Sequence, residues 1–110
     1  MMDMINKIAE DFIRESKRDY IGLYQISSAV RRDFDIANEN QRVKQLSLAV
    51  VRPILDRGLV PGDYLKSGFH VWPEGGAESI IARIDREWNP ACGDPTLGDP
   101  ICWFDLKQQA

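Results

Sequence analysis

The sequence predicts a single α+β domain, residues 1–110, with about four helices and a small antiparallel β-sheet. Three observations lead to this prediction. Four segments place apolar residues three and four positions apart, which is the spacing of a helix with one buried face. Two short runs rich in aromatic residues flank a polar turn, and a third apolar run lies near the C-terminus. A chain of 110 residues is long enough to bury one substantial core.

The first two helices follow from their apolar stripes. The first is predicted over residues 3–17, and its stripe consists of Ile5, Ile8, Ala9, Phe12 and Ile13. The second is predicted to begin at a cap formed by Asp19 and to end near Phe34. A polar loop rich in Asp and Asn, residues 35–41, follows it.

The third predicted helix contains a proline. It starts near Gln41, and Pro53 lacks the N–H that a helix interior needs. The helix therefore either kinks at Pro53, or stops near Arg52 and restarts with Pro53 in a first turn. Gly58 suits the position just past the helix, where a positive φ is common.

The second half of the chain predicts most of the sheet. Strands at 62–66 and 69–73 form a hairpin, and a fourth helix covers residues 77–88. The run ICWFDL, residues 101–106, predicts a last strand that pairs with the hairpin. Because both of its faces carry apolar residues, we expect both to be covered.

The composition indicates a protein that works in the cytosol. No run approaches the roughly 18–20 apolar residues that cross a bilayer. The start of the chain is amphipathic and carries acids, unlike a secretory signal. Because cytosolic cysteines are mostly reduced, we expect Cys92 and Cys102 to be free thiols, although a disulfide between them is conceivable.

Candidate catalytic and metal-binding residues are few. His70 is the only histidine, and a pair with Cys92 or Cys102 would be needed for cysteine nucleophilic chemistry. One histidine and two isolated cysteines do not match the closely spaced ligands of a zinc site. The sequence therefore predicts a non-enzymatic protein with no cofactor and no metal.

The charge is distributed unevenly along the chain. Residues 1–57 hold ten Lys/Arg and nine Asp/Glu, a net charge of +1, whereas residues 58–110 hold four and eight, a net charge of −4. The predicted hairpin and everything after it are therefore acidic, and such a surface favours cationic partners.

A nucleic-acid-binding role is the alternative. Three helices followed by a hairpin is the winged-helix order, and LAVVRPILDRGLV resembles the third helix of that fold. A reader of DNA needs Lys and Arg to neutralise phosphates, and this helix offers Arg42, Lys44, Arg52 and Arg57. Only Lys66 lies at the hairpin tip, and the acids around it would repel a phosphate backbone.

Aromatic residues in the predicted strands suggest a protein-binding surface. Tyr64, Trp72, Trp103 and Phe104 cluster there, and some of them must be core residues. One or two that stay exposed beside Asp and Glu would form an anchor with an electrostatic rim.

The chain also resembles a group of small bacterial proteins. The segments DYIGLYQISSAVRRDF, LAVVRPILDRGLVPGDY and GDPTLGDPICWFDL carry the resemblance, mainly through apolar and turn residues. Several of those proteins are immunity partners of toxin domains, including toxins delivered by contact-dependent growth inhibition. The resemblance implies an antitoxin that binds a toxin's active region and blocks it.

These observations together predict an immunity protein with a winged-helix-like fold, acting as a monomer or weak homodimer on a basic, nuclease-like toxin. A DNA-binding transcriptional regulator that uses the four basic residues of the third helix is the alternative. The predicted partner-binding residues are Asp63, Tyr64, Trp72, Glu74, Asp85, Asp94 and Asp99.

Overall fold

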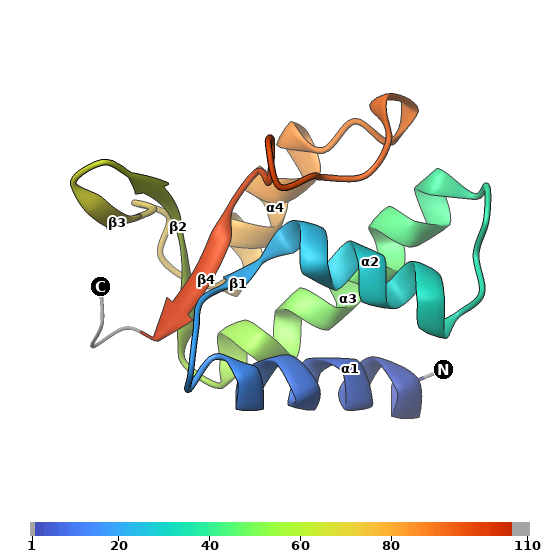
Figure 1. The fold of residues 1–110 in the computed structure, drawn as a ribbon, viewed down its shortest axis with the longest axis horizontal. Coiled ribbons are helices and arrows are strands. Elements are labelled where there is room, and N and C mark those ends of the chain that lie inside the picture. Colours follow the sequence, from blue (N-terminus) through green and yellow to red (C-terminus); the bar gives the residue numbers. More distant parts are fainter. Residues whose placement is uncertain (1, 107–110) are drawn as a thin grey trace.

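A computed structural model describes residues 2–106 of the chain. Its elements, in chain order, are α1 (Met2–Glu15), β1 (Ile21–Gly22), α2 (Leu23–Asp33), α3 (Asn40–Asp56), β2 (Leu59–Leu65), β3 (Gly68–Val71), α4 (Ala77–Glu87), the 3₁₀ turn η1 (Pro90–Cys92) and β4 (Trp103–Leu106) (Figure 1). Within these residues, four α-helices and one four-stranded antiparallel sheet confirm the predicted α+β class. The end predicted to fray, 107–110, lies outside the described residues.

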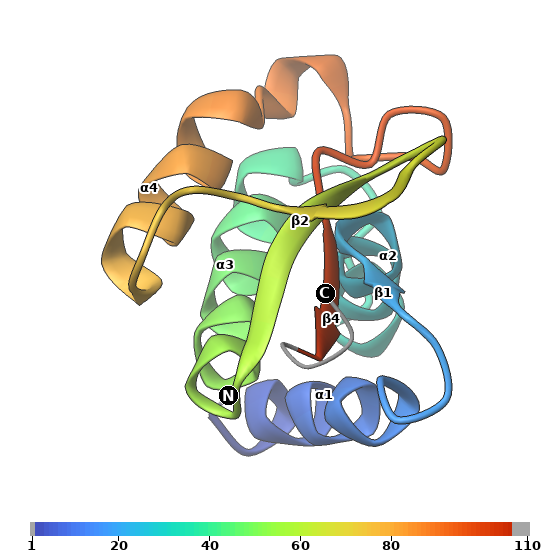
Figure 2. The same cartoon turned by 90° about the vertical axis from the view of Figure 1, so that its left-hand side faces the viewer.

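Helix α3 is the element against which the other helices pack. It contacts α1, α2 and α4, and Figure 2 shows these three helices around it. Val43, Val50 and Ile54 on α3 are fully buried. The helix continues through Pro53 to Asp56, which rules out the alternative that it stops near Arg52 and restarts. Gly58 has a φ of 97°, so its predicted left-handed conformation is confirmed.

The sheet has the strand order β1-β4-β2-β3, so the C-terminal strand lies between two earlier ones. Phe104 of β4 pairs with Ile21 of β1 and with Pro61 of β2. The predicted pairing of the last strand with the hairpin is therefore confirmed. The expected helix, helix, helix, hairpin order is also present, while the winged-helix label remains a prediction.

The start of α2 differs from the prediction. Asp19 does not cap this helix, because the chain first forms the short strand β1. The helix begins at Leu23 instead, and the Gly22 N–H donates to Gln25 Oε1 at 2.7 Å. Pairing of Ile21 with β4 therefore determines where α2 begins.

The two faces of the sheet are covered to different degrees. Ile21, Leu59 and Phe104 point into the core and are 0–2% exposed. On the opposite face, Trp103 is only half-buried. The expectation that both faces of the last strand are covered is thus right for Phe104 and only partly right for Trp103, which contacts the rings of Tyr20, Tyr24 and Tyr64 but stays partly exposed.

Both cysteines are free thiols, as predicted, with Cys92 exposed and Cys102 buried. Burial raises the pKa of Cys102 above its ordinary value. Among the described residues, no helix is both long and apolar enough to cross a membrane.

Asp35 offers a test of the loop after α2. It is exposed and has a φ of 55°, a conformation that costs residues other than glycine up to roughly 1–2 kcal/mol. We expect Asp35→Gly to raise the free energy of unfolding by about 0.5 kcal/mol, since Asp tolerates this conformation better than most residues. Asp35→Val, which is β-branched, should lower it. Urea unfolding monitored by circular dichroism measures both, and a less stable glycine variant would contradict the expectation.

Candidate functional site

An acidic groove lies between the tip of the β2–β3 hairpin and the segment 89–101. Its volume is about 670 Å³. Four carboxylates line it, from Asp63, Glu87, Asp94 and Asp99, and none of the described residues that line it is Lys or Arg. Tyr64 lines it as well. The groove therefore brings together four of the seven predicted partner-binding residues, which are Asp63, Tyr64, Asp94 and Asp99.

A cluster of aromatic rings borders the groove on the outer face of the sheet. The Tyr64 ring centroid lies 4.2 Å from that of Tyr20, 4.9 Å from Phe69 and 6.0 Å from Trp103. Tyr20 and Tyr64 are 40% and 36% exposed. These rings form an amphipathic surface of the kind that is enriched in protein interfaces.

Two glycines make room for this cluster. Gly22 and Gly62 flank Trp103 in register on the neighbouring strands. A Cβ on Gly62 would lie 2.6 Å from the Phe69 ring, and one on Gly22 would lie 2.9 Å from the Trp103 ring. The rings therefore pack directly over the backbone of the sheet, which larger residues at these positions would prevent.

The four groove carboxylates differ in how far their charge is compensated. Glu87 Oε2 pairs with Arg83 at 2.7 Å, and the Asp94 carboxylate pairs with Arg31. Asp63 Oδ2 accepts a hydrogen bond from Trp72 Nε1 at 3.1 Å. Within residues 2–106, neither Asp63 nor exposed Asp99 pairs with a basic side chain, so these two carry uncompensated negative charge into the groove.

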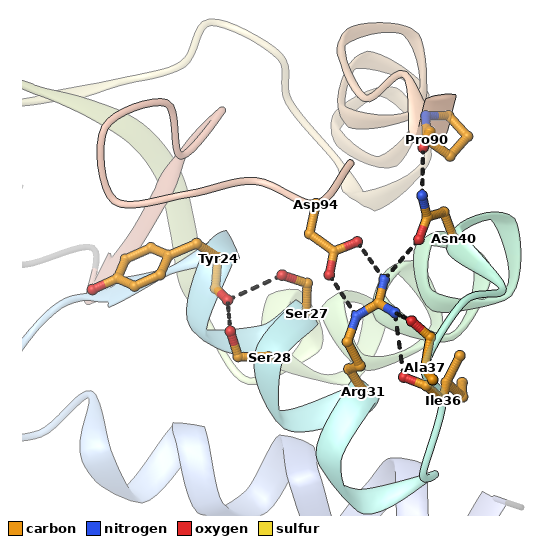
Figure 3. Close-up of polar contacts among 9 residues, drawn as sticks. All are labelled: Tyr24, Ser27, Ser28, Arg31, Ile36, Ala37, Asn40, Pro90 and Asp94. Carbon is orange, nitrogen blue, oxygen red and sulfur yellow. Dashed lines mark hydrogen bonds and ion pairs between the residues drawn. The ribbon is translucent and has the colours of Figure 1, made fainter. Parts of the chain in front are cut away.

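Arg31 fixes the wall of the groove to the helices (Figure 3). Its Nε and Nη2 donate to the two Asp94 oxygens, each at 2.9 Å. The same guanidinium donates to the carbonyls of Ile36 and Ala37 and to Asn40 Oδ1, and Asn40 Nδ2 donates to the Pro90 carbonyl. The hydrogen bond to Asp94 raises the pKa of Arg31. Asp94 therefore anchors segment 89–101, although it was predicted only as a binding residue.

Trp72 is a correction to the predicted site. It is 5% exposed and packs in the core, with the Arg83 guanidinium carbon 3.6 Å from the centre of its ring. It cannot serve as an exposed aromatic anchor, because Arg83 and the inner face of the hairpin cover it. Tyr64 remains available, and its hydroxyl donates to Asp105 Oδ2 at 2.8 Å. Partial burial and this bond raise the pKa of Tyr64.

Glu74 and Asp85 are not among the groove residues. Glu74 pairs with Arg83 at 2.9 Å, and that contact lowers the pKa of its carboxyl. Asp85 pairs with Lys44 at 2.8 Å. Both carboxylates are therefore already paired with basic side chains of the same chain.

Sequence reasoning missed several groove residues. Glu87, Trp88, Cys92 and Ile101 line the groove, and Tyr20 joins the aromatic cluster from the other end of the chain. Only the strand β1 brings Tyr20 near Trp103, and a two-residue strand has too little pattern to be predicted. The net negative charge of residues 58–110 was the sequence signal that pointed here.

The candidate DNA-contacting bases of α3, together with Arg57 just after it, all pair with acids. Arg52 pairs with Glu78 at 2.7 Å and Arg57 with Glu10 at 2.6 Å, and Arg42 lies 3.6 Å from Glu39. Lys44 is 8% exposed and also donates to the Asp85 carbonyl. Helix α3 therefore offers no continuous row of uncompensated positive charge within the described chain.

The candidate catalytic residues lie apart from one another. His70 Nε2 lies 2.6 Å from Ser67 Oγ on the exposed hairpin, and neither cysteine hydrogen-bonds to it in residues 2–106. The described residues contain no group of three or more His, Cys, Asp or Glu side chains that could hold a metal ion.

A scan against models of protein families, a search of curated proteins and a search of solved structures each found no match to this chain.

Replacing Arg31 tests the anchor of the groove wall. Arg31→Lys should lower the free energy of unfolding by about 2 kcal/mol, because an ammonium group cannot contact Asp94, Asn40 and two carbonyls at once. Arg32→Lys is the matched control, since Arg32 is exposed and, among residues 2–106, its guanidinium pairs with the neighbouring Asp33 alone. Chemical unfolding measures the difference, and equal losses in the two variants would contradict the anchoring role.

The two thiols should differ in reactivity. We expect iodoacetamide at pH 8 to alkylate Cys92 in the native protein and to leave Cys102 unmodified, because the Cys102 thiol is buried and its pKa is raised. Mass spectrometry after digestion counts the modified sites. Both should react in urea, and rapid native modification of Cys102 would contradict its burial.

Proposed function

We propose that this chain is a non-catalytic binding domain, specifically an immunity protein that blocks a basic, nuclease-like toxin. The single observation that carries the proposal is the acidic groove, where Asp63 and Asp99 are uncompensated and exposed aromatic rings lie alongside. A nuclease needs positive charge where it binds phosphates, and carboxylates placed against that surface would occlude it.

The groove combines the two properties that a tight protein interface needs. Tyr64 and Tyr20 supply rigid, partly exposed aromatic area, which is typical of residues that dominate binding energy. The surrounding carboxylates supply long-range attraction, which raises the rate of association with a cationic partner. The aromatic rings would provide affinity, and the acids would provide speed and selectivity.

The state of α3 supports this proposal over DNA binding. Each of the four candidate basic residues in α3 or just after it already has an acidic partner, so binding DNA would require breaking those pairs. Lys44 would also have to leave a nearly buried position. The groove instead presents negative charge, which repels phosphate groups.

Charge reversal in the groove tests the proposal. The partner to test is the C-terminal domain of a large secreted protein encoded beside this gene. We expect a one-to-one complex, and at low salt Asp99→Lys should slow association by about tenfold, because it places a cation against a cationic surface. Asp56→Lys is the control, since Asp56 is also exposed but lies outside the groove. Stopped-flow fluorescence measures both rates.

Two results would contradict the proposal. One is the absence of any complex with such a toxin domain, combined with salt-dependent binding to duplex DNA. The other is an equal effect of Asp99→Lys and Asp56→Lys on association, which would remove the groove from the binding surface.

A further inference from the structure

Strand β3 is a free edge of the sheet. In the order β1-β4-β2-β3 it has one neighbour, β2, and Figure 1 shows it at the outer side of the hairpin. Val71, the last residue of β3, is 46% exposed although its side chain is apolar. An edge strand presents backbone N–H and carbonyl groups with which another strand can pair.

The backbone groups of β3 alternate between β2 and the free edge. Antiparallel strands alternate residue pairs that exchange backbone hydrogen bonds with pairs that do not. The Trp72 N–H donates to the Pro61 carbonyl at 3.0 Å, so the next bonded pair along the ladder is Asp63 with His70. Phe69 and Val71 therefore direct their N–H and carbonyl groups away from β2. Outside the sheet, no backbone group of residues 2–106 hydrogen-bonds to them.

The free edge is short and bounded at both ends. Pro73, two positions after Val71, has no N–H to donate, and the turn at Lys66 and Ser67 ends the edge on the other side. Short edge strands, prolines and lysines are the means by which proteins limit open-ended strand pairing. The edge of β3 therefore fits one short, discrete pairing and not an extended stack of strands.

We propose that β3 pairs with β3 of a second copy of this chain, antiparallel and about a two-fold axis at His70, so that two four-stranded sheets become one. In this register Phe69 of each copy lies opposite Val71 of the other. Their outward N–H and carbonyl groups exchange hydrogen bonds in both of these pairs, as in other cases of strand addition. The same surface is used by both copies, so the contact closes at a dimer.

The side chains of this register complement one another. Phe69 and Val71 lie two positions apart and therefore on one face of the sheet, which is the face of Tyr64. The register places an aromatic ring opposite a β-branched side chain twice, and such cross-strand pairs are stabilising. The Phe69 ring centroid lies 4.9 Å from that of Tyr64, so Val71 of the second copy would extend the aromatic cluster.

Charge also favours a second copy as the occupant of this edge. Lys66 lies four residues before His70 and Glu74 four residues after it, so the two-fold axis brings each lysine near the level of the other copy's glutamate. Glu74 keeps its pair with Arg83 and gains a second base. A strand of the basic toxin would instead place cations beside Lys66.

The dimer leaves the acidic groove open. None of residues 68–71 lines the groove, because segment 89–101 lies on the β4 side of β2. Each copy can therefore still bind a partner, and the ratio of this chain to the toxin stays one to one. The inference is thus independent of the proposed function.

NMR of the chain alone tests the pairing directly. As the concentration of ¹⁵N-labelled protein rises from micromolar to millimolar, the amides of Phe69 and Val71 should shift and become protected from hydrogen exchange. The His70 amide, which already bonds to β2, should change less. In a mixture of ¹³C-labelled and unlabelled protein, we expect nuclear Overhauser effects between the Phe69 ring of one copy and the Val71 methyl groups of the other. Sedimentation velocity should show a weak dimer, because a short edge buries little area.

Two variants of Val71 separate its backbone from its side chain. Val71→Ala shortens the side chain and keeps the N–H, whereas Val71→Pro also removes the N–H. Proline leaves the hairpin bonds intact here, because this N–H faces the free edge. We expect the dissociation constant of the Val71→Pro dimer to be at least about tenfold that of Val71→Ala, because each dimer loses a main-chain bond at both symmetric pairs. Thermal unfolding confirms that both variants are folded.

A charge variant tests the register. At low salt, Lys66→Glu should raise the dissociation constant of the dimer about threefold, because it brings two carboxylates together at each end of the pairing. Lys17→Glu is the matched control, since Lys17 is also exposed but lies after α1, away from β3. An equal effect of the two variants would overturn the proposed register.

Three other results would overturn the self-pairing of β3. The first is a chain that stays monomeric at millimolar concentration, and the second is equal dissociation constants for Val71→Pro and Val71→Ala. The third is a response of the Phe69 and Val71 amides to the toxin domain alone, which would assign the edge to that partner. None of the three bears on the groove, so the proposed function fails separately, when no toxin complex forms.

Discussion

The ion pair between Arg31 and Asp94 is the interaction on which the groove depends. These residues are 63 positions apart, and their paired contact ties segment 89–101 to the end of α2. Asn40 adds a second tie, from the start of α3 to Pro90. Segment 89–101 has the short 3₁₀ turn η1 as its regular structure, so the contacts from Arg31 and Asn40 hold this wall of the groove, and the hairpin forms the other wall.

The length of β4 is the second constraint. Phe104 and its neighbours pair on both sides and bury the centre of the sheet, which is where most of the stability of this region lies. The strand pairs with β2 only as far as Gly62, so Asp63, Tyr64 and Leu65 lie beyond its first residue. The chain that precedes β4 instead forms the groove wall that the Arg31–Asp94 pair anchors.

The helices could be predicted from the sequence, because their apolar stripes are long and regular. Ile5, Ile8 and Ile13 are buried as their spacing indicates, and the bounds of α1 and α4 differ from prediction by one or two residues. The strand β1 could not, since two residues form no pattern. Local signals also misplaced the start of α2, where Asp19 looked like a cap but a long-range pairing of Ile21 decided the boundary.

The site was predictable in its charge but not in its geometry. The acidic second half of the sequence did indicate where the carboxylates gather. Composition could not tell that Trp72 is covered by Arg83 while Tyr64 stays exposed, because the two residues lie on opposite faces of the same hairpin. Composition also could not show that Asp94 forms an ion pair with Arg31 of the same chain.

Ion pairing within the fold, more than composition, determines the charge of the surface that a partner contacts. The first half of the chain has a small excess of basic residues, yet the bases of α3 are matched by Glu10, Glu39, Glu78 and Asp85. Three of those four acids come from other elements, so folding brings acids beside the bases of α3 and of Arg57. Asp63 and Asp99 have no such match within the described chain. These two carboxylates therefore bring negative charge to the groove, beside the exposed aromatic rings that border it.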